Sequence, residues 1–534
     1  MKNKLFTDII KENFKESILA VFSKILFALS VTFLSYYLTY LFDAFKKGRD
    51  EFYKSIIYVG IILLCIVILS FISDFFKALF IKSTNKSLKS KMIEFTIDSS
   101  YELIKEKDTG KTISRFLNDA NQIQIKAFEN FINFIYIITL VVSSFISLFL
   151  LHWLIAILAL LLLLISLIVP KIIHRYIVKA EKLYSKSNEI YTESIRDNIE
   201  GLNIFFFSNS LLQFQKKMFS AINSKEESYF KFSMTQAKVS SLMLFISLLS
   251  QIGLIVYSIF IVSLGYTTAG SVIGVASLSG NFFNGVQGLI GTISTYSGAS
   301  ILLNKFITIT SEKTTFIENL NEVVLDKINF SYEDNTLFED FNYKFTRGKK
   351  YIITGASGSG KSTLLKFIMG FEHPDKGKIL ANNDAEIINI NLKNYYEHIS
   401  YIDQSTYLLN GTIKENILLG EDIPGEKLLD IINKSQLTEF IKRQPKGLDT
   451  MLTSNGHNIS GGEKQRIALA RSLVKNVDFI LIDESTSQLD KVNRRAIEEI
   501  ILNFKDVGVI YVSHNTDEMM INKFDKRLDS KDFK

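Results

Sequence analysis

The sequence predicts a multidomain protein. An all-α domain of six membrane-spanning helices covers residues 1–322, and an α/β domain follows over residues 323–534. Three observations predict this architecture. The first half contains six long apolar segments, the second half alternates short apolar runs with helical ones, and a glycine-rich loop directly follows one of those runs.

The composition bounds the class of protein. Hydrophobic residues make up 47% of the 534 residues, charged residues 22%, and the formal net charge is +6. This balance excludes intrinsic disorder, which requires few apolar residues and a high net charge. A single cysteine, Cys65, excludes a disulfide-stapled scaffold. The length allows three or four domains of about 150 residues each.

Each apolar segment has about 20 or more residues, the length that crosses about 30 Å of hydrocarbon. The predicted spans are 18–42, 55–81, 128–151, 154–176, 239–264 and 271–295. The apolar run 131–169 is too long for one span, and His152 and Trp153 interrupt it. These two residues therefore predict a tight hairpin at the lipid–water interface.

Lysine and arginine set the expected orientation. Both are frequent in 82–127 and 171–238, whereas the intervening loops are short; the loop 43–54 is a modest exception with four basic residues. The long connections, both termini and the second domain are therefore expected in the cytoplasm. The long connections contain little Gly or Pro, which predicts paired helices that continue the spans. Ahead of the first span, an apolar helical face predicts a short interfacial helix; its residues are Phe6, Ile9, Ile10 and Phe14.

The glycine-rich loop lies between an apolar run at 351–354 and an apolar helical segment at 364–369. It matches the P-loop pattern G-x-x-x-x-G-K-[ST] with Gly355, Ala356, Ser357, Gly358, Ser359, Gly360, Lys361, Ser362 and Thr363. The backbone N–H groups of such a loop, together with the N-terminus of its helix, bind phosphate. We expect Lys361 to contact the β- and γ-phosphates of ATP and Ser362 to ligate Mg²⁺.

A second chemical signal is the apolar run 479–483, which ends in Asp483 followed by Glu484. Asp483 is predicted to bind Mg²⁺, and Glu484 is predicted to polarise the attacking water as a general base. The alternative is an acidic strand end before a helix cap, and the P-loop upstream favours the catalytic interpretation. The second domain is therefore predicted to be an α/β P-loop ATPase.

Between these motifs, residues 459–466 have the sequence I-S-G-G-E-K-Q-R. With them the chain resembles ATP-binding cassette (ABC) transporters, specifically exporter-type half-transporters that fuse one transmembrane and one nucleotide-binding domain. In that family the stretch is the signature motif Leu-Ser-Gly-Gly-Gln; here Ile459 replaces Leu and Glu463 replaces Gln. The implied signature residues, which act across a dimer on ATP held by the partner subunit, are Ser460, Gly461, Gly462 and Glu463.

The resemblance assigns roles to four further residues. Tyr332 matches the aromatic residue that stacks on adenine, and Gln404 matches the glutamine that senses and ligates Mg²⁺. His514 matches the histidine that contacts the γ-phosphate, and with Glu484 and Lys361 it completes the expected catalytic set. Asp490 ends the Ser-Gln-Leu-Asp loop that communicates across the dimer.

The resemblance also implies a quaternary structure. A single cassette cannot complete an active site that needs the signature of a second one, so the chain is expected to form a dimer. The complete set of ATP-site residues favours a homodimer, and a heterodimer with a similar half-transporter stays open. The stretches 108–119 and 193–206 resemble the cytoplasmic connections that carry coupling helices to the ATPase.

The spans contain few charges, which favours an amphipathic or apolar substrate: a peptide, a lipid or a drug-like molecule. Lys24, Asp74 and Lys77 lie near the cytoplasmic ends, where snorkelling is the simplest interpretation. The sixth span is polar, and its residues either line a path or pack helices closely. They are Ser277, Ser279, Asn281, Asn284, Gln287, Thr292 and Thr295.

The sequence therefore predicts an ATP-driven exporter, with ATP and Mg²⁺ bound, that works by alternating access in a cell membrane. An importer of the same fold and an ATP-gated channel or sensing protein remain as alternatives. A nucleic-acid-binding ATPase is disfavoured by six spans, so no nucleic acid partner is expected. The composition, rich in Lys, Ile and Asn, indicates a bacterial source.

Overall fold

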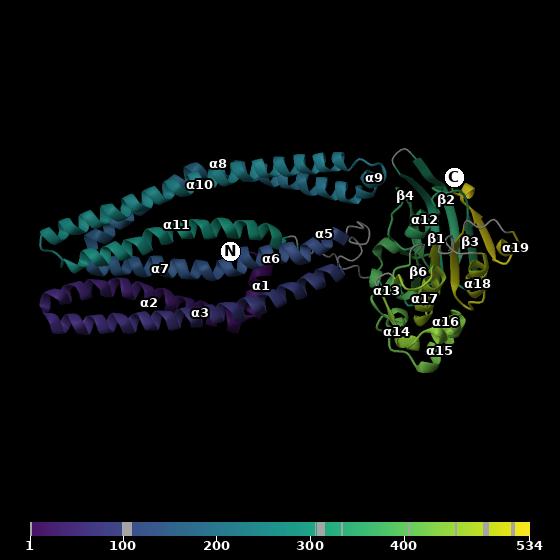
Figure 1. Ribbon diagram of the computed structural model, residues 1–534. Helices are drawn as coiled ribbons and strands as arrows, with labels where there is room; N and C mark the ends of the chain where they lie inside the picture. The colour runs from purple at the N-terminus through teal and green to yellow at the C-terminus, as the bar shows by residue number, and fades with distance from the viewer. Residues whose placement is uncertain are drawn as a thin grey trace. The chain divides into compact units, whose positions relative to one another are not determined.

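The computed structural model describes residues 3–98, 109–304, 306, 315–332, 335–403, 406–453, 456–483, 491–513 and 518–534. The chain divides into two compact units, Met1–Thr308 and Ile309–Lys534, whose elements are labelled in Figure 1. The sequence assigned residues 315–321 to the membrane domain, and the structure groups them with the second unit. The reason is local: Thr315 forms a bridge with Ile390, and the Ile317 N–H donates to Asn394 Oδ1 at 2.8 Å.

The first unit is entirely helical in its described part. Its long helices are α2 Phe14–Lys47, α3 Arg49–Asp98, α7 Asn130–Leu151, α8 Trp153–Glu200, α10 Leu211–Ser263 and α11 Gly270–Asn304. The short elements are α1 Lys4–Glu12, α5 Thr109–Ser114, α6 Ala120–Ile123, α9 Leu202–Phe207 and the π-helical turns η1 Arg115–Asp119 and η2 Gln124–Glu129. Each predicted span lies within one long helix, except that the third lies within η2 and α7 and the fifth extends one residue beyond α10.

Four stretches of the described residues are long and apolar enough to cross a membrane: Phe14–Lys47, Arg49–Ile97, Thr112–Leu151 and Leu211–Ser263. A shorter apolar stretch, Trp153–Ser166, begins α8. Helices α3, α8 and α10 have 50, 48 and 53 residues, so at about 1.5 Å per residue each is far longer than a bilayer is thick. This confirms that the long connections continue the spans as helices. Helix α3 lies along α2, and α10 lies along α8 (Figure 1).

His152 forms the predicted hairpin between α7 and α8. Its backbone is extended, with φ −167°, and its Nδ1 accepts a hydrogen bond from the Leu154 N–H at 3.3 Å. An extended residue ends α7, and a side-chain acceptor at the N-cap starts α8. The prediction of a tight turn at this position is confirmed.

The N-terminal helix α1 forms as predicted, but its apolar face packs on protein. Ile9 is fully buried, and the Phe6 ring lies 5.8 Å from the Phe128 ring and 5.5 Å from the Tyr296 ring. The Asn3 side chain also donates to the Asn304 side chain at 2.7 Å. Neighbouring helices therefore cover Phe6 and Ile9, whereas Phe14 of the same predicted face is 65% exposed, and the interfacial position of the helix stays a prediction.

The second unit combines three sheets with helices. Its strands are β1 Glu322–Tyr332, β2 Asn335–Thr346, β3 Lys350–Thr354, β4 Lys376–Ala381, β5 Ala385–Glu386, β6 Ile399–Ile402, β7 Gly411–Thr412, β8 Met451–Leu452, β9 Phe479–Asp483, β10 Gly508–Val512 and β11 Lys526–Asp529. Its α-helices are α12 Lys361–Ile368, α13 Leu392–His398, α14 Ile413–Leu418, α15 Gly425–Lys434, α16 Thr438–Arg443, α17 Gly461–Val474, α18 Lys491–Leu502 and α19 Glu518–Ile521.

The central sheet is parallel, with strand order β11-β3-β10-β9-β6. An antiparallel sheet, β2-β1-β4-β5, and the small pair β7-β8 accompany it. Side chains alternate between two cores: Ile353 and Leu481 pack toward β1, β2 and α12, while Ile352 and Ile480 pack toward α17 and α18. Both faces are covered, which explains why these strands are continuous apolar runs in the sequence.

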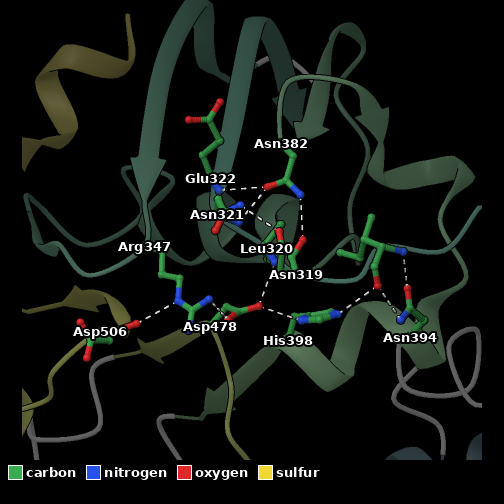
Figure 2. A network of polar contacts seen from close by, with 11 residues as sticks. Asn319, Leu320, Asn321, Glu322, Arg347, Asn382, Asn394, His398, Asp478 and Asp506 are labelled. Carbon is green, nitrogen blue, oxygen red and sulfur yellow. Dashed lines mark hydrogen bonds and ion pairs between the residues drawn. The ribbon is translucent and has the colours of Figure 1, made fainter.

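A network of hydrogen bonds and ion pairs connects the segment before β1, residues 315–321, to the parallel sheet (Figure 2). Asp478, which precedes β9, accepts from the Leu320 N–H at 2.8 Å and faces His398 Nδ1 at 2.7 Å. Its other oxygen pairs with Arg347 at 2.8 Å. His398 Nε2 lies 3.2 Å from the Ile317 carbonyl oxygen. Both ring nitrogens of His398 thus lie within hydrogen-bonding distance of oxygen atoms from other segments.

Candidate functional site

The phosphate loop connects the carboxyl end of β3 to α12. Its glycines hold backbone conformations that side chains rarely adopt: φ is +149° at Gly355, +77° at Gly358 and +94° at Gly360. Gly355 also leaves no room for a side chain, because a Cβ there would lie 1.9 Å from Ser530 Oγ. The loop shape therefore depends on glycine at these positions, as the pattern predicts.

Lys361 is 4% exposed and lies folded over the loop. Its ammonium donates to the Gly355 carbonyl at 3.1 Å and to the Ala356 carbonyl at 2.7 Å. Gly360 caps α12 without a side-chain acceptor, which leaves the helix N-terminus open toward an anion. A phosphate group placed there would meet backbone donors, the helix dipole and the Lys361 charge together.

The structure brings two predicted metal ligands together. Ser362 Oγ, in the first turn of α12, donates to Asp483 Oδ1 at 3.2 Å, although the residues are 121 positions apart. Asp483 ends β9 and is 7% exposed. β3 and β9 both flank β10, so their carboxyl ends lie on the same edge of the sheet. A hydroxyl and a carboxylate are hard oxygen donors, which fit Mg²⁺.

Tyr332 ends β1 as an exposed aromatic ring with 44% of its surface accessible. The ring packs edge-on against Phe330 at 4.8 Å, and Phe330 packs edge-on against Phe367 of α12 at 5.2 Å. Edge-to-face aromatic contacts thus connect the predicted adenine-binding residue to the helix that follows the phosphate loop. This geometry suits a flat base beside a phosphate site.

Four predicted site residues, Gln404, Glu484, Asp490 and His514, lie outside the described residues. Two of their described neighbours lie at the same edge of the sheet as the phosphate loop. Asp483 ends β9, and the Ser513 N–H, just after β10, donates to the Ile353 carbonyl at 3.0 Å.

The signature residues form the N-terminus of α17, and the structure explains the unusual Glu463. Its carboxylate accepts from the Ser460 N–H at 2.8 Å and from the Ser460 hydroxyl at 2.7 Å. This arrangement is a capping box, in which the N-cap and the third helical residue satisfy each other. The negative charge also lies favourably at the positive end of the helix dipole. Nothing lies within 4 Å of a Cβ placed on Gly461, and Gly462 is buried.

Tyr401 is a site neighbour that the sequence analysis missed. It lies in β6, beside β9, and its hydroxyl is 3.4 Å from Asp403 Oδ1. Burial, together with the carboxylates of Asp403 and Asp483, raises the pKa of Tyr401 well above its ordinary value. The hydroxyl therefore stays protonated as a donor beside the site. No motif marks this residue, since a strand tyrosine is ordinary.

Arg471 is a second residue that the sequence analysis missed. From α17 its guanidinium donates to the Tyr407 carbonyl at 2.8 Å and to the Asn416 carbonyl and side chain at 2.5 and 2.7 Å. Asn416 is fully buried, and its side chain also accepts from the Leu409 N–H at 2.9 Å. Burial lowers the pKa of Arg471. The signature helix is thereby fastened to the loop around 407–416.

In the membrane unit, Lys24 and Asp74 form an ion pair at 3.2 Å. Lys24 is 8% exposed, and its ammonium lies 5.3 Å from the centre of the Phe27 ring and 5.6 Å from that of Tyr136. The snorkelling interpretation is therefore wrong for Lys24, because a carboxylate and two aromatic rings satisfy the charge within the helices.

The polar residues of α11 include several that pack helices. Ser35 Oγ of α2 accepts from Ser277 at 2.9 Å and from Asn281 at 3.1 Å. A Cβ on Gly274 would lie 2.0 Å from Thr39 Oγ1, and one on Gly285 would lie 2.5 Å from a Val141 methyl group. For this part of α11, close packing is the interpretation that the structure supports.

Both units match known families. Residues 17–286 match the family model of the ABC transporter transmembrane region, and residues 338–487 match the family model described as ABC transporter. The transport/processing ATP-binding protein ComA of Streptococcus pneumoniae is 27% identical over 495 residues, covering 90% of this chain and 68% of ComA. A probable ABC transporter ATP-binding/permease protein of Haemophilus influenzae is 37% identical over 212 residues, which are 39% of this chain and 38% of that relative.

The fold also matches a solved structure. A bacterial Atm1-family ABC exporter with ATP bound superimposes with a TM-score of 0.81 and 18% sequence identity, covering 96% of this chain and 94% of that chain. At this identity the match shows the fold: a helical transmembrane domain followed by an α/β nucleotide-binding domain.

Proposed function

The chain belongs to the ABC transporters, with the transmembrane region and the ATP-binding domain in one polypeptide, and from that membership we propose that it is an ATP-driven exporter. The observation that carries the proposal is the Ser362–Asp483 contact at 3.2 Å beside an open phosphate loop. The contact supports the proposal because a hydroxyl and a carboxylate, the phosphate loop and the start of α12 lie at one edge of a sheet, in a chain that also has long apolar helices.

We assign the chemistry residue by residue. The phosphate loop holds ATP, and Lys361 exchanges its two carbonyl partners for the β- and γ-phosphates. Ser362, Asp483 and Gln404 would hold Mg²⁺, which would neutralise phosphate charge. Glu484 takes a proton from the attacking water, and His514 orients the γ-phosphate. ATP and water give ADP and inorganic phosphate.

We propose that the protein acts as a dimer in a bacterial cell membrane, with the ATPase units in the cytoplasm. The signature residues Ser460 to Glu463 and the residue Asp490 then close over ATP held by the partner subunit. A homodimer is the simplest assembly for one chain with a complete motif set. Closure of the two ATPase units would favour one orientation of the spans over the other, which is alternating access.

The region around α9 supports this coupling. In the membrane unit, Ile204, Phe206 and Phe207 of α9 are 73%, 63% and 83% exposed, an apolar cluster at the end of a helical connection. Exposed aromatic clusters of this kind are typical of docking surfaces. We propose that the segments 108–119 and 193–206, the second of which includes most of α9, are the coupling regions of the chain.

ATP hydrolysis in lipid nanodiscs tests the proposed function. We expect wild-type turnover to fall more than about 100-fold in Glu484→Gln, the range of loss typical of a missing general base. Glu426→Gln is the matched control, since Glu426 is an exposed carboxylate in the first turn of α15, and it should retain wild-type turnover. Equal turnover in wild type and Glu484→Gln would refute the assignment of the base.

A further inference from the structure

Gln251 of α10 and Asn284 of α11 lie at the midpoints of the fifth and sixth predicted spans, 239–264 and 271–295. Both carry primary amides, and Asn284 is exposed within the unit. Ser247, one turn before Gln251, lies between them: its hydroxyl donates to Asn284 Oδ1 at 3.1 Å and accepts from Gln251 Nε2 at 3.0 Å. Gln251 Nε2 also lies 3.5 Å from Asn284 Oδ1. We call these three residues the amide cluster.

The internal contacts of the amide cluster do not use all of its hydrogen-bonding groups. Its internal contacts use the Gln251 amide nitrogen and the Asn284 amide oxygen. Within the described part of the chain, Gln251 Oε1 and Asn284 Nδ2 form no hydrogen bond, so one acceptor and one donor are left for a ligand. One acceptor and one donor from neighbouring helices are thus available near the middle of the predicted spans.

This arrangement contrasts with the other polar contacts of α11. Asn281, one turn before Asn284, donates to Ser35 and so serves packing between α11 and α2. An exposed amide at mid-span would be unfavourable against hydrocarbon, because lipid tails offer no hydrogen-bond partner. Polar side chains at this depth face the interior of a bundle or a water-filled cavity. The amide cluster therefore marks a surface of the unit that faces a polar path.

An acceptor near a donor complements one residue of an extended peptide, whose N–H and C=O point to the same side of the chain. Apolar side chains surround the cluster on α10: Leu244 is 51% exposed, Leu248 is 47% exposed and Ile252 is 57% exposed. Such a surface suits a chain that carries amide groups between apolar side chains. A lipid tail or a neutral aromatic drug would leave both amide groups unsatisfied.

We infer that the amide cluster is a substrate-binding site that recognises the peptide backbone of an apolar peptide. The inference rests on the proposed exporter function and narrows its substrate class. Gln251 Oε1 accepts from a backbone N–H of the peptide, and Asn284 Nδ2 donates to a backbone carbonyl. Ser247 is a positioning residue that fixes the orientation of both amides.

A pair of matched ligands tests the inference. The first probe is an acetylated and amidated octapeptide of alternating leucine and alanine, and the second is its analogue with every backbone N–H methylated. Binding of both to the full-length protein in nanodiscs is measured by fluorescence. We expect wild type to bind the unmodified peptide about tenfold more tightly, and Gln251→Leu and Asn284→Leu each to reduce the ratio to about two or less.

The controls separate binding from folding and assembly. Gln236→Leu changes an exposed amide about four turns earlier on α10, and the tenfold ratio should persist. The dimer mass of Gln251→Leu and Asn284→Leu should match wild type, and Gln236→Leu should keep both the wild-type dimer mass and the wild-type ATP turnover without peptide. If the variants lose the dimer, or if wild type does not distinguish the two peptides, the inference is overturned. If the wild-type protein does not hydrolyse ATP, the proposed function is refuted instead.

Discussion

The phosphate loop and helix α11 are both rich in glycine and polar residues, and they use glycine differently. In the loop, Gly355, Gly358 and Gly360 have positive φ and shape the backbone itself. In α11, Gly274 and Gly285 lie within a helix and permit close approach of α2 and α7. Backbone shape is a local property that a motif specifies, whereas helix packing depends on residues far away in the chain.

The largest expected effect tests the loop side of this comparison. Gly355→Ala places a methyl group 1.9 Å from Ser530 Oγ and forces alanine to adopt φ +149°. We expect nucleotide affinity to fall more than about 100-fold, since strain and a steric clash act together. Gly425→Ala is the control, because a Cβ there meets nothing within 4 Å. Titration with a fluorescent ATP analogue measures both, and unchanged affinity in Gly355→Ala would contradict the description of the loop.

A second large effect concerns the polar network in Figure 2. Asp478→Asn removes the buried charge that Arg347 and His398 share, and breaking such a group costs about 3–5 kcal/mol. The loss should appear as faster hydrogen exchange in 315–321 and at the start of β9. Asp506→Asn is the matched control, since Asp506 bonds Arg347 through its backbone carbonyl and its positive φ of 60° suits asparagine. Unchanged exchange in Asp478→Asn would show that the network does not fasten this segment.

The packing side of the comparison is tested by Gly274→Ala. The added methyl group would meet Thr39 Oγ1 at 2.0 Å, and overpacking of this kind costs about 1–3 kcal/mol. Thr39→Ala removes the obstructing oxygen, so the double variant should regain most of the loss. Thermal unfolding in detergent measures all three variants, with Gly253→Ala, which has open space, as the control. If the double variant is no more stable than Gly274→Ala, the glycine has another role.

The smallest expected effect concerns Glu463. Glu463→Gln keeps an oxygen that can accept from the Ser460 N–H but removes a charge from the N-terminus of α17, which is worth about 0.3–1 kcal/mol. We expect a slightly lower unfolding temperature and no loss of the helix cap. Glu463→Ala, which removes the capping box altogether, should cost more, about 1 kcal/mol. An equal loss in both variants would mean that charge, and not capping, explains this residue.

The difference between the two regions also explains what the sequence could predict. The P-loop and the strand that ends in Asp483 follow from short patterns, because the residues that build each feature are neighbours in the chain. The spans and the hairpin at His152 follow from hydropathy for the same reason. Site residues outside the described part, such as Glu484 and His514, stay predictions.

The features that were missed depend on contacts between distant segments. Arg471 bonds a loop 55 to 64 positions away, and Lys24 pairs with Asp74 50 positions away. The spacing of apolar residues predicts that Phe6 lies on an apolar helical face. Only packing decides whether protein or lipid covers that face. Likewise, Asn281 and Asn284 are alike in sequence, and their different partners separate a packing residue from a proposed binding residue.

The most direct test of ATP-driven export is transport in reconstituted vesicles. ATP added outside reaches only molecules whose ATPase unit faces outward, so an exporter should move the labelled leucine–alanine octapeptide into the lumen. We predict ATP-dependent accumulation with wild type and none with Glu484→Gln. ATP-dependent loss of peptide from preloaded vesicles would indicate an importer, and flux without ATP would indicate a channel; either result would contradict the account.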